Sequence, residues 1–222
     1  TISPKNAKYV AVVENVKELR LIGKTNLEFW NKQLTDKPFQ PFDNQGFAEI
    51  TITATELVWK GFRFNELTFV LSVVERNQPN STLQAYLLQA FNSNRFFAFC
   101  ERFFFSTPYN FGKVNFRETT PFLMKSQNLK IEMSENERQF FEEDEHWEGA
   151  VFLPGENYFI AKLSGKSQVF AFDEADKIEF KNDAENDVFD LLNKSAFVGK
   201  EWRRRSDAFH AKSKTYRLGS EK

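Results

Sequence analysis

The strongest constraint on the fold is a pair of adjacent segments in which apolar and polar residues alternate. In residues 47–59, FAEITITATELVW, the side chains of Ile50 and Ile52 fall on one face of an extended chain and threonines fall on the other. After a short link around Gly61, residues 63–75 repeat the alternation as RFNELTFVLSVVE. Two such runs predict a long antiparallel pair of strands, and therefore a sheet with one buried face.

The remaining segments predict more strands and a few helices. Residues 25–34 have helical spacing with Thr25 as a possible N-cap, and residues 183–197 predict a capped helix. Further strands are expected within 10–24, 112–118, 121–141 and 150–172, the last with turns at PGEN and SGKS. The acidic run 142–149 is expected to separate two of these strand regions.

Residues 82–105 form the best helix candidate of the chain. At 100° per residue, Gln84, Arg95 and Arg102 fall on one side of such a helix, so both arginines face the same way. A break at 92–94 is the alternative, and it leaves a loop followed by a shorter helix.

Length and composition favour one domain that spans residues 1–222. Hydrophobic residues make up 41% of the 222, and the 27 phenylalanines predict an unusually aromatic core. Thirty basic and 31 acidic side chains leave a net charge of -1, so no overall charge directs the protein toward nucleic acid or an anionic membrane. Neither partner is expected.

Cysteine usage and the charged segments add three expectations. The single cysteine, Cys100, cannot form an internal disulfide, and no apolar run reaches the roughly 18 residues of a spanning helix, so a cytoplasmic location is expected. The basic C-terminal tail, residues 199–222, is interpreted as a solvated helix face that neutralises the acidic stretch 142–148. Binding of phosphate or of an acidic partner is its alternative role.

Several common kinds of site are disfavoured by residue type and spacing. His146 and His210 lie far apart in a chain with one cysteine, which excludes zinc-type ligand spacing. No Walker or G-x-G-x-x-G pattern is present, and no G-x-S-x-G elbow marks a nucleophilic serine. We therefore expect neither a metal nor a cofactor.

The segment RFFAFCERFFFSTPYNFGKV, residues 95–114, places charged side chains among eight aromatic rings. Burial of an unpaired charge is costly, so these charges must be paired or must serve a function. One interpretation is a structural ion-pair network of Arg95, Glu101 and Arg102 at the edge of an aromatic core.

The other interpretation of this segment is a reactive site that includes Tyr109 and Lys113. An ammonium group that faces apolar rings or a nearby guanidinium loses preference for its charged form, so its pKa falls. A lysine amine that is neutral near pH 7 can attack a carbonyl group.

Two stretches of the chain, LVWKGFRFNELTFVLSV and AFNSNRFFAFCERFFFSTPYNFGKV, resemble the acetoacetate decarboxylase-like superfamily. In that superfamily a strand with an aromatic-x-Glu motif precedes a central helix and a lysine-bearing segment. NLEFWNKQL occupies the place of the superfamily's early helix, and the resemblance covers residues 17–120.

The resemblance implies an α+β fold with mainly antiparallel strands. A closed or partly closed β-barrel or cone would enclose an apolar cavity, with a central helix and peripheral helices. Lys113 would be the candidate Schiff-base lysine and Glu66 the pocket glutamate; acetoacetate decarboxylase itself is the standard example of a lysine activated in this way. Decarboxylating members carry a Gly-aromatic-Pro-Lys-like segment, commonly with a second adjoining lysine, whereas Lys113 lies between Gly112 and Val114.

Three functions stay open at this point. The first is binding of a small apolar or keto-acid-like ligand through its carbonyl or carboxylate group. The second is a Schiff-base lyase that uses Lys113 as nucleophile and Glu66 to handle protons. The third is a protein-interaction domain whose exposed aromatic residues dock a partner chain, and a homo-oligomer is possible in each case. The expected substrate-binding residues are Arg95, Glu101, Arg102 and Tyr109.

Overall fold

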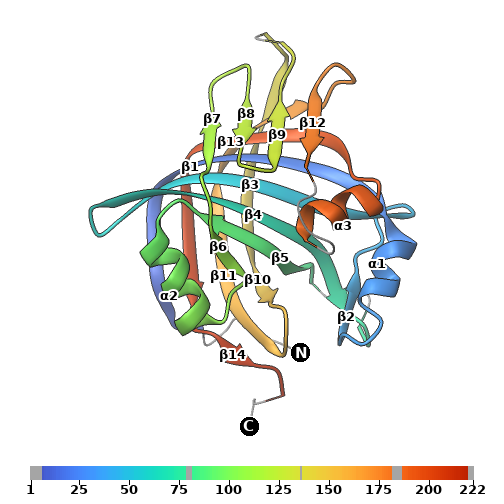
Figure 1. Ribbon diagram of the computed structural model, residues 1–222, viewed down its shortest axis with the longest axis vertical. Coiled ribbons are helices and arrows are strands. Elements are labelled where there is room, and N and C mark those ends of the chain that lie inside the picture. Colours follow the sequence, from blue (N-terminus) through green and yellow to red (C-terminus); the bar gives the residue numbers. More distant parts are fainter. Residues whose placement is uncertain (1–6, 79–81, 136, 182–186, 220–222) are drawn as a thin grey trace.

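A closed ring of seven strands is the main feature of the computed structural model, which describes residues 7–78, 82–135, 137–181 and 187–219. The strands follow the order β4-β3-β1-β13-β11-β10-β5, and β5 pairs again with β4 (Figure 1). Within the ring only β10 and β5 are paired in parallel. The bounds of these strands are β1 (Tyr9–Asn26), β3 (Phe47–Trp59), β4 (Phe62–Glu75), β5 (Gln84–Asn92), β10 (Phe140–Phe152), β11 (Asn157–Ala171) and β13 (Val198–Ser213).

Short strands and three helices of the described residues complete the fold. A separate four-stranded sheet has the order β12-β9-β8-β7 and lies beyond one end of the ring (Figure 1). The remaining elements are β2 (Phe39–Pro41), β6 (Tyr109–Phe111), β7 (Asn115–Arg117), β8 (Leu123–Lys125), β9 (Leu129–Glu132), β12 (Lys177–Phe180), β14 (Tyr216–Arg217), α1 (Leu27–Gln33), α2 (Arg95–Phe105) and α3 (Val188–Lys194).

The predicted hairpin of β3 and β4 is present with the expected faces. Ile50 pairs with Leu71 and Ile52 with Phe69, and these side chains are fully buried. Alternation of apolar and polar residues therefore determined the register, because a shift by one residue would turn every buried side chain outward.

The main core covers this apolar face of the ring. Trp30 of α1, Phe189 of α3 and Met124 of β8 join the same cluster of buried side chains as the strand residues. Phe69 meets Phe189 edge to face at a centroid distance of 5.5 Å. The two helices and the small sheet therefore pack on one face of the ring and shield it from water.

The helix expected over 82–105 is wrong for its first half. Residues 84–92 are strand β5, and only α2 is helical, so the break at 92–94 is correct while the expected loop is a strand. Gln84 is buried in β5, and its side chain accepts a hydrogen bond from the backbone N–H of Ala150. The pairing of β5 with β4 and β10 outweighs the helix preference of its leucine, alanine and glutamine residues.

Three expectations for the second half of the chain are also corrected. The acidic run 142–149 lies inside β10 rather than between strands, and SGKS at 164–167 lies inside β11 rather than in a turn. The basic tail is mainly strand β13 and not a helix face, although it does neutralise the acidic run. At α1 the N-cap is Asn26 rather than Thr25, since the Asn26 side chain accepts from the N–H of Phe29.

Candidate functional site

A half-buried carboxyl group, that of Glu66, lies on the second, polar face of the ring. Strand pairing places Thr55, Glu66 and Asn92 side by side on this face. Asn92 Nδ2 donates to Glu66 Oε1 at 2.9 Å, and the Tyr109 hydroxyl donates to Oε2 at 3.0 Å. Loss of solvent raises the pKa of Glu66 to about 7, and the nearby Glu101 carboxylate adds to the rise. Near neutral pH this group can therefore both donate and accept a proton.

Tyr109 is held in place by the parallel pairing of β6 with β5, where it lies opposite Ala90. Burial, followed by the neighbouring carboxylates of Glu66 and Glu101, raises the pKa of the Tyr109 hydroxyl well above its ordinary value. The hydroxyl therefore remains protonated and stays available as a hydrogen-bond donor.

An amine reaches the same region from β13. Lys212 Nζ is paired with the Glu101 carboxylate of α2, whose Oε2 also accepts from Thr107 Oγ1 at 2.8 Å. The ammonium lies 4.4 Å from the ring centroid of Phe105 and 4.7 Å from that of Phe159. Its charge acts on Glu66 as well, where it opposes the rise in pKa. Lys212 is thus a cation that is paired with α2 and whose charge acts on Glu66.

A dense ion-pair network continues along this polar face. Glu18 is 1% exposed and accepts from Arg205 Nε at 3.0 Å and Nη2 at 2.6 Å, and its Oε2 lies 2.7 Å from His210 Nε2. Burial alone would raise the pKa of Glu18, but the guanidinium groups of Arg20 and Arg205 hold it well below its usual range. We refer to the face that carries Glu18, Glu66 and Lys212 as the charged face.

The ring curls toward the charged face. Arg20 of β1 pairs with Glu145 of β10, although β13 and β11 lie between these strands in the sheet. Arg205 Nη1 also lies 3.4 Å from Glu145 Oε2. Side chains from strands three positions apart meet in this way when the sheet is concave on their side, so the part of the sheet from β1 to β10 is concave toward the charged face.

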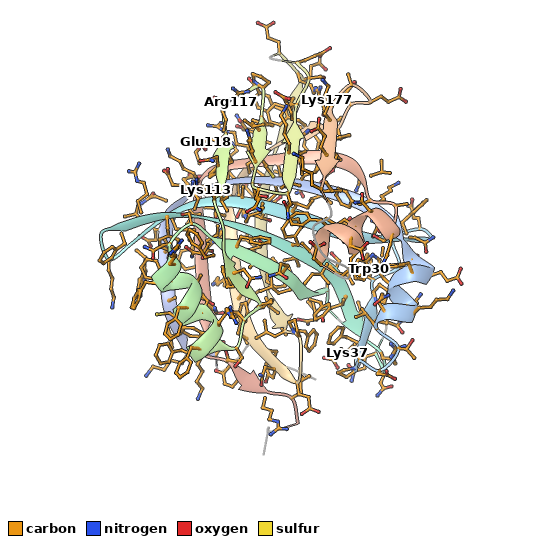
Figure 2. All side chains as sticks on the ribbon, in the orientation of Figure 1. Trp30, Lys37, Lys113, Arg117, Glu118 and Lys177 are labelled. Carbon is orange, nitrogen blue, oxygen red and sulfur yellow. The ribbon has the colours of Figure 1, made fainter. Side chains whose placement is uncertain are left out.

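The other charged residues of the segment 95–114 do not join this group. Arg95, Arg102 and Lys113 are exposed, so these three side chains are not enclosed in an apolar interior. Figure 2 shows Lys113 on the segment that leads to β7, below Arg117 and Glu118. Of the expected site residues, the structure brings together Glu66, Glu101 and Tyr109.

Lys212 and the network around Glu18 were missed as site residues from the sequence. In the sequence Lys212 is marked only as one of several basic residues of the tail, and Glu18 and Arg205 are 187 residues apart. No local pattern reveals such a pair, because only the closure of the ring between β1 and β13 makes them neighbours.

The structure also contains an open recess of about 770 Å³ on the opposite, apolar face. The buried rings of Phe122 and Phe170 lie against it, and Arg204 and Glu118 supply charge at its wall. Arg204 Nη1 is hydrogen bonded to Gln168 at 2.9 Å. This recess does not adjoin Glu66, so it is not the apolar cavity expected beside the candidate site residues.

The described part of the chain contains neither a metal-type cluster nor a membrane-spanning helix. No group of three or more His, Cys, Asp or Glu side chains there could hold a metal ion. No helix there has the length and apolar character needed to cross a bilayer.

Comparison with known proteins relates the fold to one group of solved structures. No family model matches the sequence, and no curated protein matches it significantly. The enduracididine biosynthesis enzyme MppR complexed with pyruvate has 8% sequence identity and a TM-score of 0.64, with 98% of this chain and 93% of that chain covered. An acetoacetate decarboxylase from Legionella pneumophila has 9% identity and a TM-score of 0.63, with coverage of 99% and 91%.

A third structure, an acetoacetate decarboxylase-like enzyme from Sphingomonas wittichii, covers 98% of this chain and 97% of its own at 7% identity and a TM-score of 0.57. The chain has the acetoacetate decarboxylase-like fold. The expected fold class, with mainly antiparallel strands and additional helices, is thereby confirmed. At such low identity the likeness concerns the acetoacetate decarboxylase-like fold and not the residues of the site.

Two of the expected site residues differ in exposure. Tyr109 is buried and bonded to Glu66, whereas Lys113 is exposed.

Proposed function

We propose that the chain binds a small molecule with a carbonyl or carboxylate group on the charged face, beside Glu66. The fold supports this assignment, since one structure with the same fold is described as complexed with pyruvate. The main observation behind the proposal is the Glu66 carboxyl group, which has a pKa of about 7 and accepts hydrogen bonds from Tyr109 and Asn92. Protonated Glu66 can donate to a ligand oxygen, and Lys212 offers a positive charge nearby.

A Schiff-base lyase is the second candidate function. The amine nitrogen would attack the keto carbon of a β-keto acid and water would leave, giving an iminium ion. The electrons of the bond to the departing carbon dioxide would then move into the iminium, and protonated Glu66 could return a proton to the resulting enamine. Lys113 is the amine indicated by the sequence, and Lys212 is the amine whose charge acts on Glu66.

The first test measures binding of acetoacetate and pyruvate by calorimetry. The variant Glu66→Gln removes the titratable proton, and we expect it to raise the Kd at least about tenfold, because one charge-assisted hydrogen bond is lost. Glu28→Gln is the matched control, since Glu28 is an exposed carboxylate far from the charged face. Equal affinity of the wild type and of both variants, or no binding of either compound, would contradict the proposed site.

Borohydride reduction in the presence of acetoacetate distinguishes the lyase from the binder. A stable adduct mapped by mass spectrometry to Lys212 would support the lyase with an amine on the charged face, and one on Lys113 would support the amine indicated by the sequence. Lys212→Met and Lys113→Ala supply the controls. Binding without any adduct would leave the ligand-binding function and exclude the Schiff-base reaction with this substrate.

A further inference from the structure

Helix α2 turns its aromatic side chains outward. Phe96, Phe99, Phe103 and Phe104 are 67%, 57%, 70% and 66% exposed, while its one fully buried residue is Ala98. Phe99 stacks on Phe103 at 5.5 Å, and Phe103 meets Phe104 edge to face at 5.1 Å. A helix on a water-exposed surface normally turns polar side chains outward and buries its apolar side chains, so the outward face of α2 is suited to contact with an apolar environment.

The exposed rings continue beyond the helix. Phe62, at the tip of the β3–β4 hairpin, is 60% exposed and is linked to α2 through Phe97 at a centroid distance of 5.9 Å. Phe111 is 45% exposed and carries the Arg95 guanidinium 4.6 Å above its ring. Figure 1 shows α2 and the hairpin tip on the same side of the molecule. We define the aromatic patch as Phe62, Phe96, Phe99, Phe103, Phe104 and Phe111.

The charges around the aromatic patch are predominantly positive. Arg95, Arg102 and Lys113 are exposed on α2 and the segment after it. Between residues 82 and 117 the sequence contains one acidic residue, Glu101, and its carboxylate is paired with Lys212. The patch therefore combines exposed rings with basic groups whose own segment carries a single carboxylate, which is already paired with Lys212.

We propose that the aromatic patch docks on the surface of an anionic lipid bilayer. Phenylalanine rings and arginines on one short helix suit the boundary between headgroups and acyl chains, where rings enter the apolar layer and guanidinium groups contact phosphates. Each basic residue near an anionic leaflet strengthens the attachment. With 11 residues, α2 lies in the plane of the interface and does not span the membrane.

Charge also favours a bilayer over a second copy of the chain. A symmetric dimer through the patch would place the positive groups of both copies in one interface to which the patch residues supply no carboxylate. An anionic lipid surface supplies negative charge to the same groups. This inference is independent of the ligand proposed for the charged face.

Flotation with vesicles tests the proposal directly. We expect the wild-type protein to float with vesicles that contain phosphatidylserine, to float weakly with pure phosphatidylcholine vesicles, and to detach as salt is added. The double variant Phe99→Ser/Phe103→Ser should lower vesicle binding at least about tenfold, because two apolar anchors are removed. Phe141→Ser is the matched control, since Phe141 is 60% exposed on β10 and lies outside the patch.

A second readout uses the single native cysteine. An environment-sensitive dye on Cys100 of α2 should shift its emission to shorter wavelength when phosphatidylserine vesicles are added. Thermal unfolding of the double variant checks that exposed rings were removed without loss of fold. Absence of flotation by the wild type, or equal flotation of the double variant and Phe141→Ser, would overturn the proposal.

Self-association is the remaining outcome of the test. Light scattering on the wild type and on Phe99→Ser/Phe103→Ser compares their masses in solution. A dimer that the double variant abolishes, together with no vesicle binding, would overturn the lipid surface and assign the patch to a second copy.

Discussion

The titration of Glu66 connects the candidate site with the stability of the fold. Its carboxyl group is held by Tyr109 and Asn92 while burial and Glu101 disfavour its charge, which raises its pKa to about 7. In the unfolded chain the same group titrates near its ordinary pKa of 4.5. Between these values the folded state binds more protons than the unfolded state, so this group lowers stability as pH rises from about 4.5 to about 7.

Replacement of Glu66 by Gln should remove that dependence on pH. We expect the free energy of unfolding of Glu66→Gln, relative to that of the wild type, to be higher at pH 8 than at pH 5 by up to about 3 kcal/mol. The reason is that only the wild type must ionise a buried group as the pH rises. Urea unfolding of both proteins at the two pH values measures this difference. A difference in free energy that does not change with pH would show that Glu66 titrates normally.

At the level of single residues, the sequence predicted part of the site. The motif around Glu66 and the position of Tyr109 came from local patterns and a family resemblance, and the structure places them in contact. Arg95 and Arg102 do lie on one helix, but helical spacing alone does not tell which side of a helix is buried. Lys212 could not be chosen among the basic residues of its segment, because its carboxylate partner is 111 residues away.

At the level of elements, helix α2 positions the Glu101 carboxylate that pairs with Lys212. The helix begins at a defined N-cap, where Asn94 Oδ1 accepts from the N–H groups of Phe96 at 3.0 Å and Phe97 at 3.4 Å. It ends at Ser106, whose φ of 55° is left-handed. These terminal interactions hold a helix that buries little apolar surface of its own.

Removal of the N-cap should therefore lower the stability of the protein even though the helix is exposed. We expect Asn94→Ala to lower the free energy of unfolding by about 1 kcal/mol and to speed amide exchange in the first turn of α2, because two N–H groups lose their acceptor. Asn110→Ala, an exposed asparagine on β6, should cost less than about 0.5 kcal/mol. Equal effects of the two changes in urea unfolding and hydrogen exchange would contradict the role of Asn94.

The errors of element prediction have a common physical origin. Strands β5, β10 and β13 carry glutamines, acids and arginines that find many of their partners on other strands, so their patterns do not resemble half-buried strands. The hairpin of β3 and β4 was predictable because its pattern and its pairing are both local. Closure of the ring depends on contacts between distant segments, and these outweigh local preference.

For the whole molecule, the ion pairs of the charged face join the first strand of the ring to the last. Glu18 of β1 and Arg205 of β13 are each nearly inaccessible to water, and Arg20 and Glu145 link the same group to β10. The guanidinium groups of Arg20 and Arg205 hold the Glu18 pKa well below its ordinary value. Its contribution to stability is therefore fully present above pH 4.5 and is lost only as pH falls through the lowered pKa.

Removal of the Glu18 charge should weaken the closure of the ring. We expect Glu18→Gln to lower the free energy of unfolding by about 3 kcal/mol at pH 7, and by nearly as much at pH 5, because Arg205 loses its main counter-charge while it stays buried. Glu28→Gln, which breaks the exposed pair with Lys32, should cost no more than about 0.5 kcal/mol.

The double variant Glu18→Gln/Arg205→Met separates the loss of a favourable pair from the penalty of an isolated charge. Since the methionine removes the uncompensated guanidinium, we expect the double variant to be more stable than Glu18→Gln alone, as measured by urea unfolding at pH 7. A double variant less stable than the single one would mean that Arg205 supports the ring through Glu145 and not through Glu18. In that case the β13–β10 contact, at 3.4 Å between Arg205 and Glu145, would be the one that closes this side of the molecule.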